Sequence, residues 1–365
     1  MVDKYRNPLK FALYRARFAL IRRAIAPLLE WAPLADAAEG YSVVIGCSVD
    51  LVPILRANLQ MLIGQERTNL RRVILVFDRC EAEARGQVEP ALSRQFGAAL
   101  PLEFVFYTPR QHQVMRRYDW GWTYCWLNWM LGLAACRTRY ALIHDLDAML
   151  VRRDLLESRY TAAHGAQAAF CGSGYYHSNG ILESDRLLTT FEMVCDVAYL
   201  RRRFRPVDFF NLPARWKGRR VEFDTFLWPQ AFGDAGARSI MMPIDVREMV
   251  HPSQMICQFM DVRRKARYVA PANNNVLMIP YFLDLGGDRA ALTEQQRAID
   301  ASDGHVVRCF GRDVDFRHFS PVHARWLTEQ ATRLDSAVHG AVRPAVARYF
   351  AAVEDLPRRR AGGTR

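Results

Sequence analysis

The sequence lacks several features that would assign it to a common class. It has no uninterrupted apolar run of about 20 residues, the length that crosses a bilayer. Arginines at positions 15, 17, 22 and 23 interrupt the N-terminal apolar stretch, which argues against a signal-peptide core. The eight cysteines form no CxxC pair and match no zinc or disulfide framework. Scattered thiols of this kind predict a protein of the reducing cytoplasm.

Nucleic-acid binding is not predicted either, although the net charge is +12. Such an excess favours polyanions in general, among them phosphorylated ligands and anionic membranes. No nucleic-acid reading motif appears, and the basic residues are spread widely along the chain. Half of the 365 residues are hydrophobic, so the chain can build a sizeable core, which excludes global disorder.

Residues 8–31 predict a basic amphipathic helix. Its apolar residues recur at three- and four-residue steps and fall on one face: Phe11, Tyr14, Phe18, Ile21, Ile25, Leu28 and Leu29. Arg15, Arg22 and Arg23 lie on the opposite side. Such a helix either covers the core of the following domain or rests on an anionic membrane surface. Helix-breaking residues then place a boundary near residue 40.

Residues 41–144 alternate between short apolar runs and helical patterns. Strands are expected at 41–47, 73–77, 102–107 and 140–144, and helices at 51–63, 81–99 and 122–135. This order predicts an α/β fold with an open, mostly parallel sheet and helices on both faces. In such sheets a ligand lies beyond the carboxyl ends of the strands, which selects Cys47-Ser48, Asp78 and the segment after His144.

The pattern is looser beyond residue 151. We expect strands at 168–171 and 180–183 and helices at 186–199, near Asp224 and over 321–350. The tail after Asp355 is basic and contains two glycines, which is typical of disorder.

The most specific motif joins the fourth strand to two acids, Asp145 and Asp147. Carboxylates at i and i+2 after a buried strand can point the same way and hold Mg²⁺ or Mn²⁺. Two acids between apolar runs are otherwise expensive to desolvate. The alternative is a turn in which the acids cap the next element.

The order of elements and this Asp-x-Asp motif resemble the GT-A glycosyltransferases over about residues 41–235. The resemblance implies a nucleotide-sugar donor that Asp145 contacts through the bound metal. It also implies that Asp78 contacts the nucleobase and that Ser48 lines the nucleoside pocket. Asp78 is equally well read as a turn carboxylate. The implied catalytic domain covers 41–320, with a nucleotide-binding half at 41–150 and an acceptor half at 151–320. A helical segment at 321–355 and a basic tail at 356–365 follow it.

Two segments resemble the glycogenin-like retaining branch. Residues 178–182 resemble a strand that faces the donor sugar there, which implies a role for Asn179. Residues 317–326 resemble a segment that implies His318 as the third metal ligand and Arg325 as a contact of the pyrophosphate. The sequence departs from that pattern, because Asn179 directly precedes Gly180 and because Pro and Arg replace the usual Gly and Lys. An ordinary Asn-Gly turn and a structural histidine are the alternatives, and His251 is the competing third ligand.

Asp224, with Glu222 second, is the candidate general base. In inverting GT-A enzymes an acid in this region takes the proton of the acceptor hydroxyl. The alternative is a helix cap, since a helix is expected to begin near Asp224. Retaining enzymes need no such base, so the stereochemistry stays open.

The sequence as a whole predicts transfer of a hexose from a UDP-sugar to a glycan, a lipid-linked saccharide or a similar acceptor. The basic N-terminal helix suggests work at the inner face of the cell membrane, in surface-polysaccharide assembly. A noncatalytic GT-A-like protein that binds a glycan or a protein partner is the alternative. A sugar nucleotidyltransferase ranks lower, because it needs a Gly-rich basic loop where Cys47-Ser48-Val49-Asp50 stands.

Overall fold

The computed structural model describes residue 5 and residues 7–175, 179–233, 239–245, 247–302 and 304–359. The chain divides into two compact units. The first, here called the sheet unit, consists of Met1–Asp50, Gln65–Leu146 and Arg153–Ile244. The second, the helical unit, consists of Leu51–Gly64, Asp147–Arg152 and Asp245–Arg365. Each unit is described by itself.

A seven-stranded sheet forms the centre of the sheet unit. Its strand order is β10-β6-β7-β4-β1-β2-β3. The strands are β1 (Ala38–Cys47), β2 (Leu70–Cys80), β3 (Leu102–Tyr107), β4 (Thr138–His144), β6 (Phe170–Gly174), β7 (Leu188–Asp196) and β10 (Ser239–Met241). Strands β4, β1, β2 and β3 run parallel to one another, whereas β7 is antiparallel to both of its neighbours. The predicted α/β class and mostly parallel sheet are therefore confirmed.

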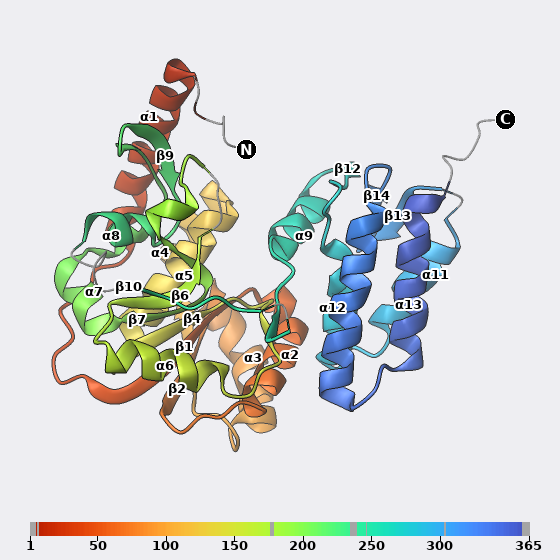
Figure 1. Ribbon diagram of the computed structural model, residues 1–365, viewed down its shortest axis with the longest axis horizontal. Coiled ribbons are helices and arrows are strands. Elements are labelled where there is room, and N and C mark those ends of the chain that lie inside the picture. Colours follow the sequence, from red (N-terminus) through yellow and green to blue (C-terminus); the bar gives the residue numbers. More distant parts are fainter. Residues whose placement is uncertain are drawn as a thin grey trace. The chain divides into compact units, whose positions relative to one another are not determined.

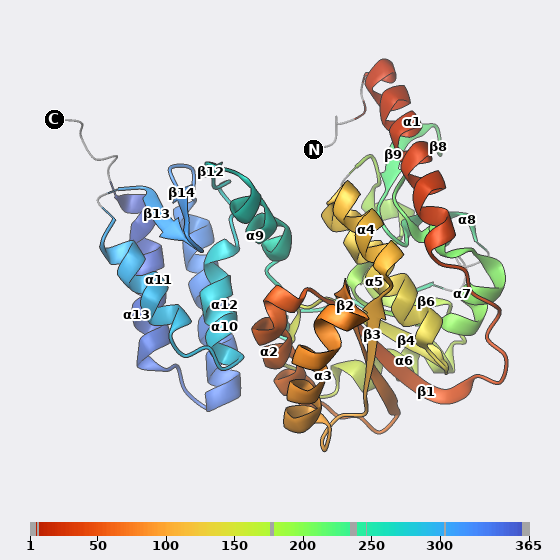
Figure 2. The same cartoon turned by 180° about the vertical axis from the view of Figure 1, so that it is seen from behind.

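Helices cover both faces of this sheet. They are α1 (Pro8–Ile25), α3 (Glu81–Phe96), α4 (Pro109–Tyr118), α5 (Gly121–Ala135), α6 (Leu155–Gly165), α7 (Val197–Arg203) and α8 (Leu227–Phe232). Figure 1 shows α6 in front of the sheet, and Figure 2 shows α4 and α5 in front of its other face. Helix α5 packs so closely on β1 that a Cβ atom added at Gly132 would lie only 2.2 Å from Val44 Cγ1. A hairpin of β8 (Leu212–Trp216) and β9 (Arg219–Phe223) completes the unit.

Helix α1 buries one face against the sheet unit. Phe18, Ile21 and Ile25 belong to the same hydrophobic cluster as α5 and β4. The Arg22 guanidinium donates a 2.8 Å hydrogen bond to the Phe210 carbonyl and lies 3.4 Å from the Asp208 carboxylate. This face of the predicted amphipathic helix therefore covers a core, as the first of its two interpretations expected.

The sequence interpretation of residues 180–199 was wrong in two places. The expected helix at 186–199 is largely strand β7, which inserts between β4 and β6. It is buried on both faces, so it shows no alternating pattern that would distinguish a strand. The expected strand at 180–183 is instead a turn and a single bridge that lead into a 3-10 turn at Glu183–Asp185.

The helical unit contains six α-helices among its described residues. They are α2 (Val52–Ile63), α9 (Met255–Arg264), α10 (Ile279–Leu285), α11 (Ala291–Asp300), α12 (Pro321–His339) and α13 (Pro344–Asp355). Short strands pair as β5 (Met149–Leu150) with β11 (Met249–Val250), and β12 (Tyr268–Val269) with β14 (Arg312–Asp315), which also pairs with β13 (Val306–Cys309). The single helix expected at 321–350 is thus two helices, because Gly340 adopts a left-handed φ of 77° and ends α12.

Buried charge holds the last helices together. The Arg343 guanidinium lies 2.7 Å from both Asp284 and Asp335, which reach it from α10 and α12. Pairing at this geometry compensates the desolvation of the carboxylates. The residues after 359 lie outside the described part of the chain, so the expected disorder of the tail stays a prediction. Among the described residues, no helix is both long and apolar enough to span a membrane.

Candidate functional site

The two acids of the Asp-x-Asp motif follow the carboxyl end of β4. The backbone N–H of Asp145 donates a 3.0 Å hydrogen bond to the Phe191 carbonyl, so the β4–β7 pairing extends to the first acid. The chain then turns, and β5 begins at Met149. The turn leaves Asp145 partly exposed and Asp147 buried.

A short antiparallel ladder brings Asp147 and His251 together. The β5–β11 pairing ends where Met149 lies opposite Val250. Asp147 precedes this end by two residues, and His251 directly follows Val250. The ladder continues on its far side, where the N–H groups of Val151 and Arg152 both donate to the Glu248 carbonyl. The 2.7 Å ion pair between Arg152 and Glu248 reinforces that end. The register of this ladder therefore positions the imidazole beside the acid.

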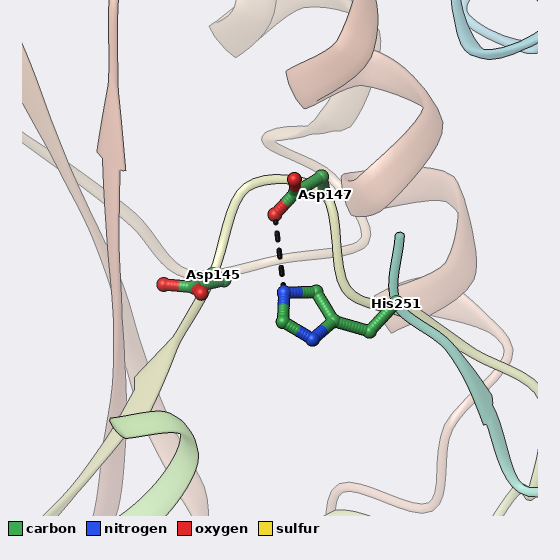
Figure 3. Close-up of side chains that lie close together, drawn as sticks. All are labelled: Asp145, Asp147 and His251. Carbon is green, nitrogen blue, oxygen red and sulfur yellow. Dashed lines mark ion pairs between the residues drawn. The ribbon is translucent and has the colours of Figure 1, made fainter. Parts of the chain in front are cut away.

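The resulting cluster has the geometry of a cation site. His251 Nε2 lies 3.5 Å from Asp147 Oδ1, and both side chains are nearly buried, at 12% and 7% exposure. Figure 3 shows the edge of the imidazole ring facing Asp147, with Asp145 on the same turn. Asp145, Asp147 and His251 each offer one ligand atom within 4.8 Å of the others. Two carboxylates and an imidazole are a donor set that suits Mn²⁺ and related divalent cations.

The other predicted ligand segment lies elsewhere in the helical unit. His318 is exposed on the turn before α12, and it is not part of the cluster found among the described residues. Arg325 is exposed on α12. The nearby His323 donates a 2.7 Å hydrogen bond from Nε2 to Asn275 Oδ1 and stacks on Trp326. The His323 ring is partly buried in the packing of this unit, and this burial lowers its pKa.

The nucleoside candidates Ser48 and Asp78 lie together at the ends of β1 and β2. Asp78 is 9% exposed and accepts hydrogen bonds from the Ser48 side chain and from the Val49 N–H, the latter at 3.3 Å. Burial raises the pKa of Asp78, and the Arg79 guanidinium at 3.5 Å acts in the opposite direction. Because β4, β1 and β2 are parallel and consecutive in the sheet, Asp145, Ser48 and Asp78 all lie at the carboxyl ends of these strands.

The two acids proposed as general base differ in their surroundings. Asp224 is partly exposed in the turn before α8, where its Oδ1 accepts hydrogen bonds from Asn211 Nδ2 at 2.9 Å and from the Thr225 N–H at 2.8 Å. Glu222 is 1% exposed in β9, and the Tyr5 hydroxyl donates a hydrogen bond to it. The partly exposed Asp224 is the better placed of the two to meet a ligand.

Asn179 lies in a tight turn. Asn179 and Gly180 both have positive φ angles, of 54° and 81°, as Asn-Gly turns require. The Asn179 carbonyl accepts a 2.9 Å hydrogen bond from the Glu222 N–H, which ties this turn to β9. Ser178, in the same predicted segment, lies outside the described residues.

One pair beneath the motif was not singled out from the sequence. His144 Nδ1 and Glu192 Oε2 are 2.5 Å apart, and both side chains are fully buried. They lie opposite each other in the β4–β7 register, and His144 directly precedes Asp145. The sequence signal is a lone Glu within an apolar run, and it was missed because residues 186–199 were predicted to be helical.

Comparison with protein-family models and with curated proteins finds no match. Among solved structures, the chain is similar to the galactosyltransferase LgtC in complex with donor and acceptor sugar analogues, at 13% identity and a TM-score of 0.34, over 45% of this chain and 60% of LgtC. It is also similar to the mannosyltransferase PcManGT from Pyrobaculum calidifontis in complex with GDP-Man and Mn²⁺, at 16% identity and a TM-score of 0.38, over 90% and 93% of the two chains.

A third similar structure is the bifunctional glycosyltransferase WbbM, at 8% identity and a TM-score of 0.40, over 88% of this chain and 52% of WbbM. The chain therefore spans less than two thirds of the length of LgtC and of WbbM.

Proposed function

We propose that this chain is a divalent-metal-dependent glycosyltransferase that uses a nucleotide-sugar donor. The observation that carries the proposal is the cluster of Asp145, Asp147 and His251 after the carboxyl end of β4. In open α/β sheets, ligands bind beyond the carboxyl ends of the strands. A site of two carboxylates and an imidazole at this place fits a cation that accompanies an anionic ligand.

The neighbouring strand ends support a nucleotide as that ligand. Ser48 directly follows β1, the strand next to β4, and Asp78 lies near the end of β2, the next strand beyond β1. Asp78 is nearly buried yet has hydrogen-bonding partners that hold its carboxylate in place. A fixed carboxylate of this kind can accept hydrogen bonds from a nucleobase or a ribose. We assign the nucleoside to these residues and the diphosphate to the cluster.

The bound cation would neutralise charge on the departing nucleoside diphosphate. Asp145, Asp147 and His251 would hold it, with the β5–β11 ladder fixing the last two. In the transfer, the bond from the sugar to the diphosphate breaks and a bond to the acceptor oxygen forms. If the configuration inverts, Asp224 takes the proton of the acceptor hydroxyl. The hydrogen bonds from Asn211 and from the Thr225 N–H would orient the Asp224 carboxylate for this step.

The finer assignments rest on the sequence resemblance. They are a UDP-sugar donor, Mn²⁺ or Mg²⁺ as the cation, and a glycan or lipid-linked saccharide as the acceptor. His251 replaces His318 as the preferred third ligand, because only His251 belongs to the cluster.

Thermal melting with nucleotides tests the proposal. UDP, GDP and several UDP-sugars are added to the full chain, each with Mn²⁺ and with EDTA. A ligand at about a hundred times its dissociation constant adds about 2.7 kcal/mol of stability. Stabilisation by one nucleotide only when Mn²⁺ is present is the expected result, and it identifies the nucleotide. A well-folded sample that responds to none of these ligands contradicts the proposal and favours a noncatalytic protein.

A further inference from the structure

The outer face of α1 carries an exposed apolar stripe. Leu9, Leu13 and Leu20 are 69%, 64% and 70% exposed, which places them among the most exposed large apolar side chains of the described chain. Spacings of four and seven residues place all three on one side of a helix. The opposite side is occupied by the buried Phe11, Phe18, Ile21 and Ile25. Helix α1 is therefore apolar on two faces, only one of which the sheet unit covers.

Basic residues flank this stripe, and no acidic residue does so within the helix. The 18 residues of α1 include five Lys or Arg and no Asp or Glu. Arg22 is engaged with Asp208, whereas the other four are exposed: Lys10, Arg15, Arg17 and Arg23. Exposed leucines between exposed cations are the pattern of helices that lie in the interface of an anionic membrane.

A groove of about 530 Å³ opens beside Leu20. It is lined by Arg17, Leu20 and Ile21 of α1 and by Arg117, Tyr118 and Trp120. The Arg17 guanidinium lies 3.9 Å from the centre of the Trp120 ring, and Trp120 packs edge-to-face on Trp122. Trp122 is itself 39% exposed. Arginine and tryptophan together are typical of surfaces at the level of lipid headgroups.

We propose that α1 docks the protein on a membrane surface rich in anionic phospholipid, with the leucine stripe inserted at the headgroup boundary. Figures 1 and 2 show α1 along the outside of the sheet unit, with its N-terminal half beside the β8–β9 hairpin. A lipid surface accounts for both features of the helix, because the leucines gain an apolar environment and the cations gain anionic partners. A second copy of the chain fits less well, since a symmetric contact would bring the same cations face to face.

Vesicle flotation of the full chain tests this proposal, and it needs no assay of sugar transfer. The protein is mixed with vesicles of phosphatidylcholine containing phosphatidylglycerol, and with vesicles of phosphatidylcholine alone. We expect binding to the anionic vesicles that falls as salt is raised. In the double variant Leu13→Gln, Leu20→Gln, binding should fall at least about tenfold, because both side chains lose their burial in the acyl region.

The matched control is Val322→Gln, which changes a side chain that is 68% exposed on α12. It should bind anionic vesicles as the unchanged chain does. The melting temperature of each variant verifies folding. Absence of binding to anionic vesicles overturns the proposal, as does binding that the double variant retains. Light scattering tests whether a second copy of the chain covers the stripe instead. A dimer that the double variant abolishes, together with no vesicle binding, would assign the stripe to a second copy and overturn the proposal.

Discussion

His144 and Glu192 face each other across β4 and β7, with His144 Nδ1 2.5 Å from Glu192 Oε2 and both side chains removed from solvent. The pair joins the strand that carries the Asp-x-Asp motif to its antiparallel neighbour. Because Asp145 directly follows His144, this contact also fixes the starting point of the turn that holds the candidate ligands. The pair is thus a support for the site.

Replacing Glu192 with Ala should lower the free energy of unfolding by at least about 2 kcal/mol. Losing a buried hydrogen-bonding partner costs roughly 1–3 kcal/mol, and truncating a fully buried side chain adds the cost of the cavity that it leaves. Urea denaturation measures the change. Glu329→Ala, at an exposed position of α12, is the control and should stay within about 0.5 kcal/mol of the unchanged chain. An equally small change for Glu192→Ala would contradict a supporting role.

The parallel half of the sheet could be predicted from the sequence because its strands are marked locally. β1, β2 and β4 are short apolar runs bounded by polar residues, and they alternate with helical patterns. The same reasoning identified the strand end that carries Asp145 and Asp147. β7 could not be found in this way, since a strand buried on both faces differs from a buried helix only through its distant partners β4 and β6.

The third member of the cluster also depends on a distant contact. Nothing near His251 in the sequence indicates that β11 pairs with β5, because each of these strands has only two residues. The family resemblance favoured His318, whose neighbouring residues match a motif. Geometry instead selects the histidine that the β5–β11 register places beside Asp147. Long-range pairing of this kind is not contained in local patterns.

Asp147→Asn should remove the stabilisation that Mn²⁺ confers and should abolish sugar transfer, with little change in the fold. The amide keeps the volume of the side chain but lacks the negative charge that a hard cation prefers. Melting curves in Mn²⁺ and in EDTA measure the first effect. Asp313→Asn, at an exposed position of β14, should respond to Mn²⁺ as the unchanged chain does. Activity retained by Asp147→Asn would remove the metal assignment.

Asp78→Asn should change how stability depends on pH. Burial raises the pKa of Asp78 in the folded chain above its usual value near 3.8, so the folded state binds the proton more tightly than the unfolded state. The free energy of unfolding therefore falls as pH rises from about 3.8 through the folded pKa. The variant lacks this ionisation, so its stability relative to the unchanged chain should improve over that window. Urea denaturation from acidic to neutral pH measures the difference, and parallel profiles would contradict a raised pKa.

His251→Ala and His318→Ala together decide the third ligand. His251 Nε2 is 3.5 Å from Asp147 Oδ1, so removing the imidazole should weaken Mn²⁺ binding by at least about tenfold, the lower bound for losing even an indirect partner of a metal site. His318 is exposed and outside the cluster, so His318→Ala should leave Mn²⁺ affinity unchanged. Titration calorimetry with Mn²⁺ and UDP measures both. If Mn²⁺ affinity were lost only in His318→Ala, His318 would be the third ligand, as the family resemblance implies. The segment before α12 would then have to bind the cation together with the two acids.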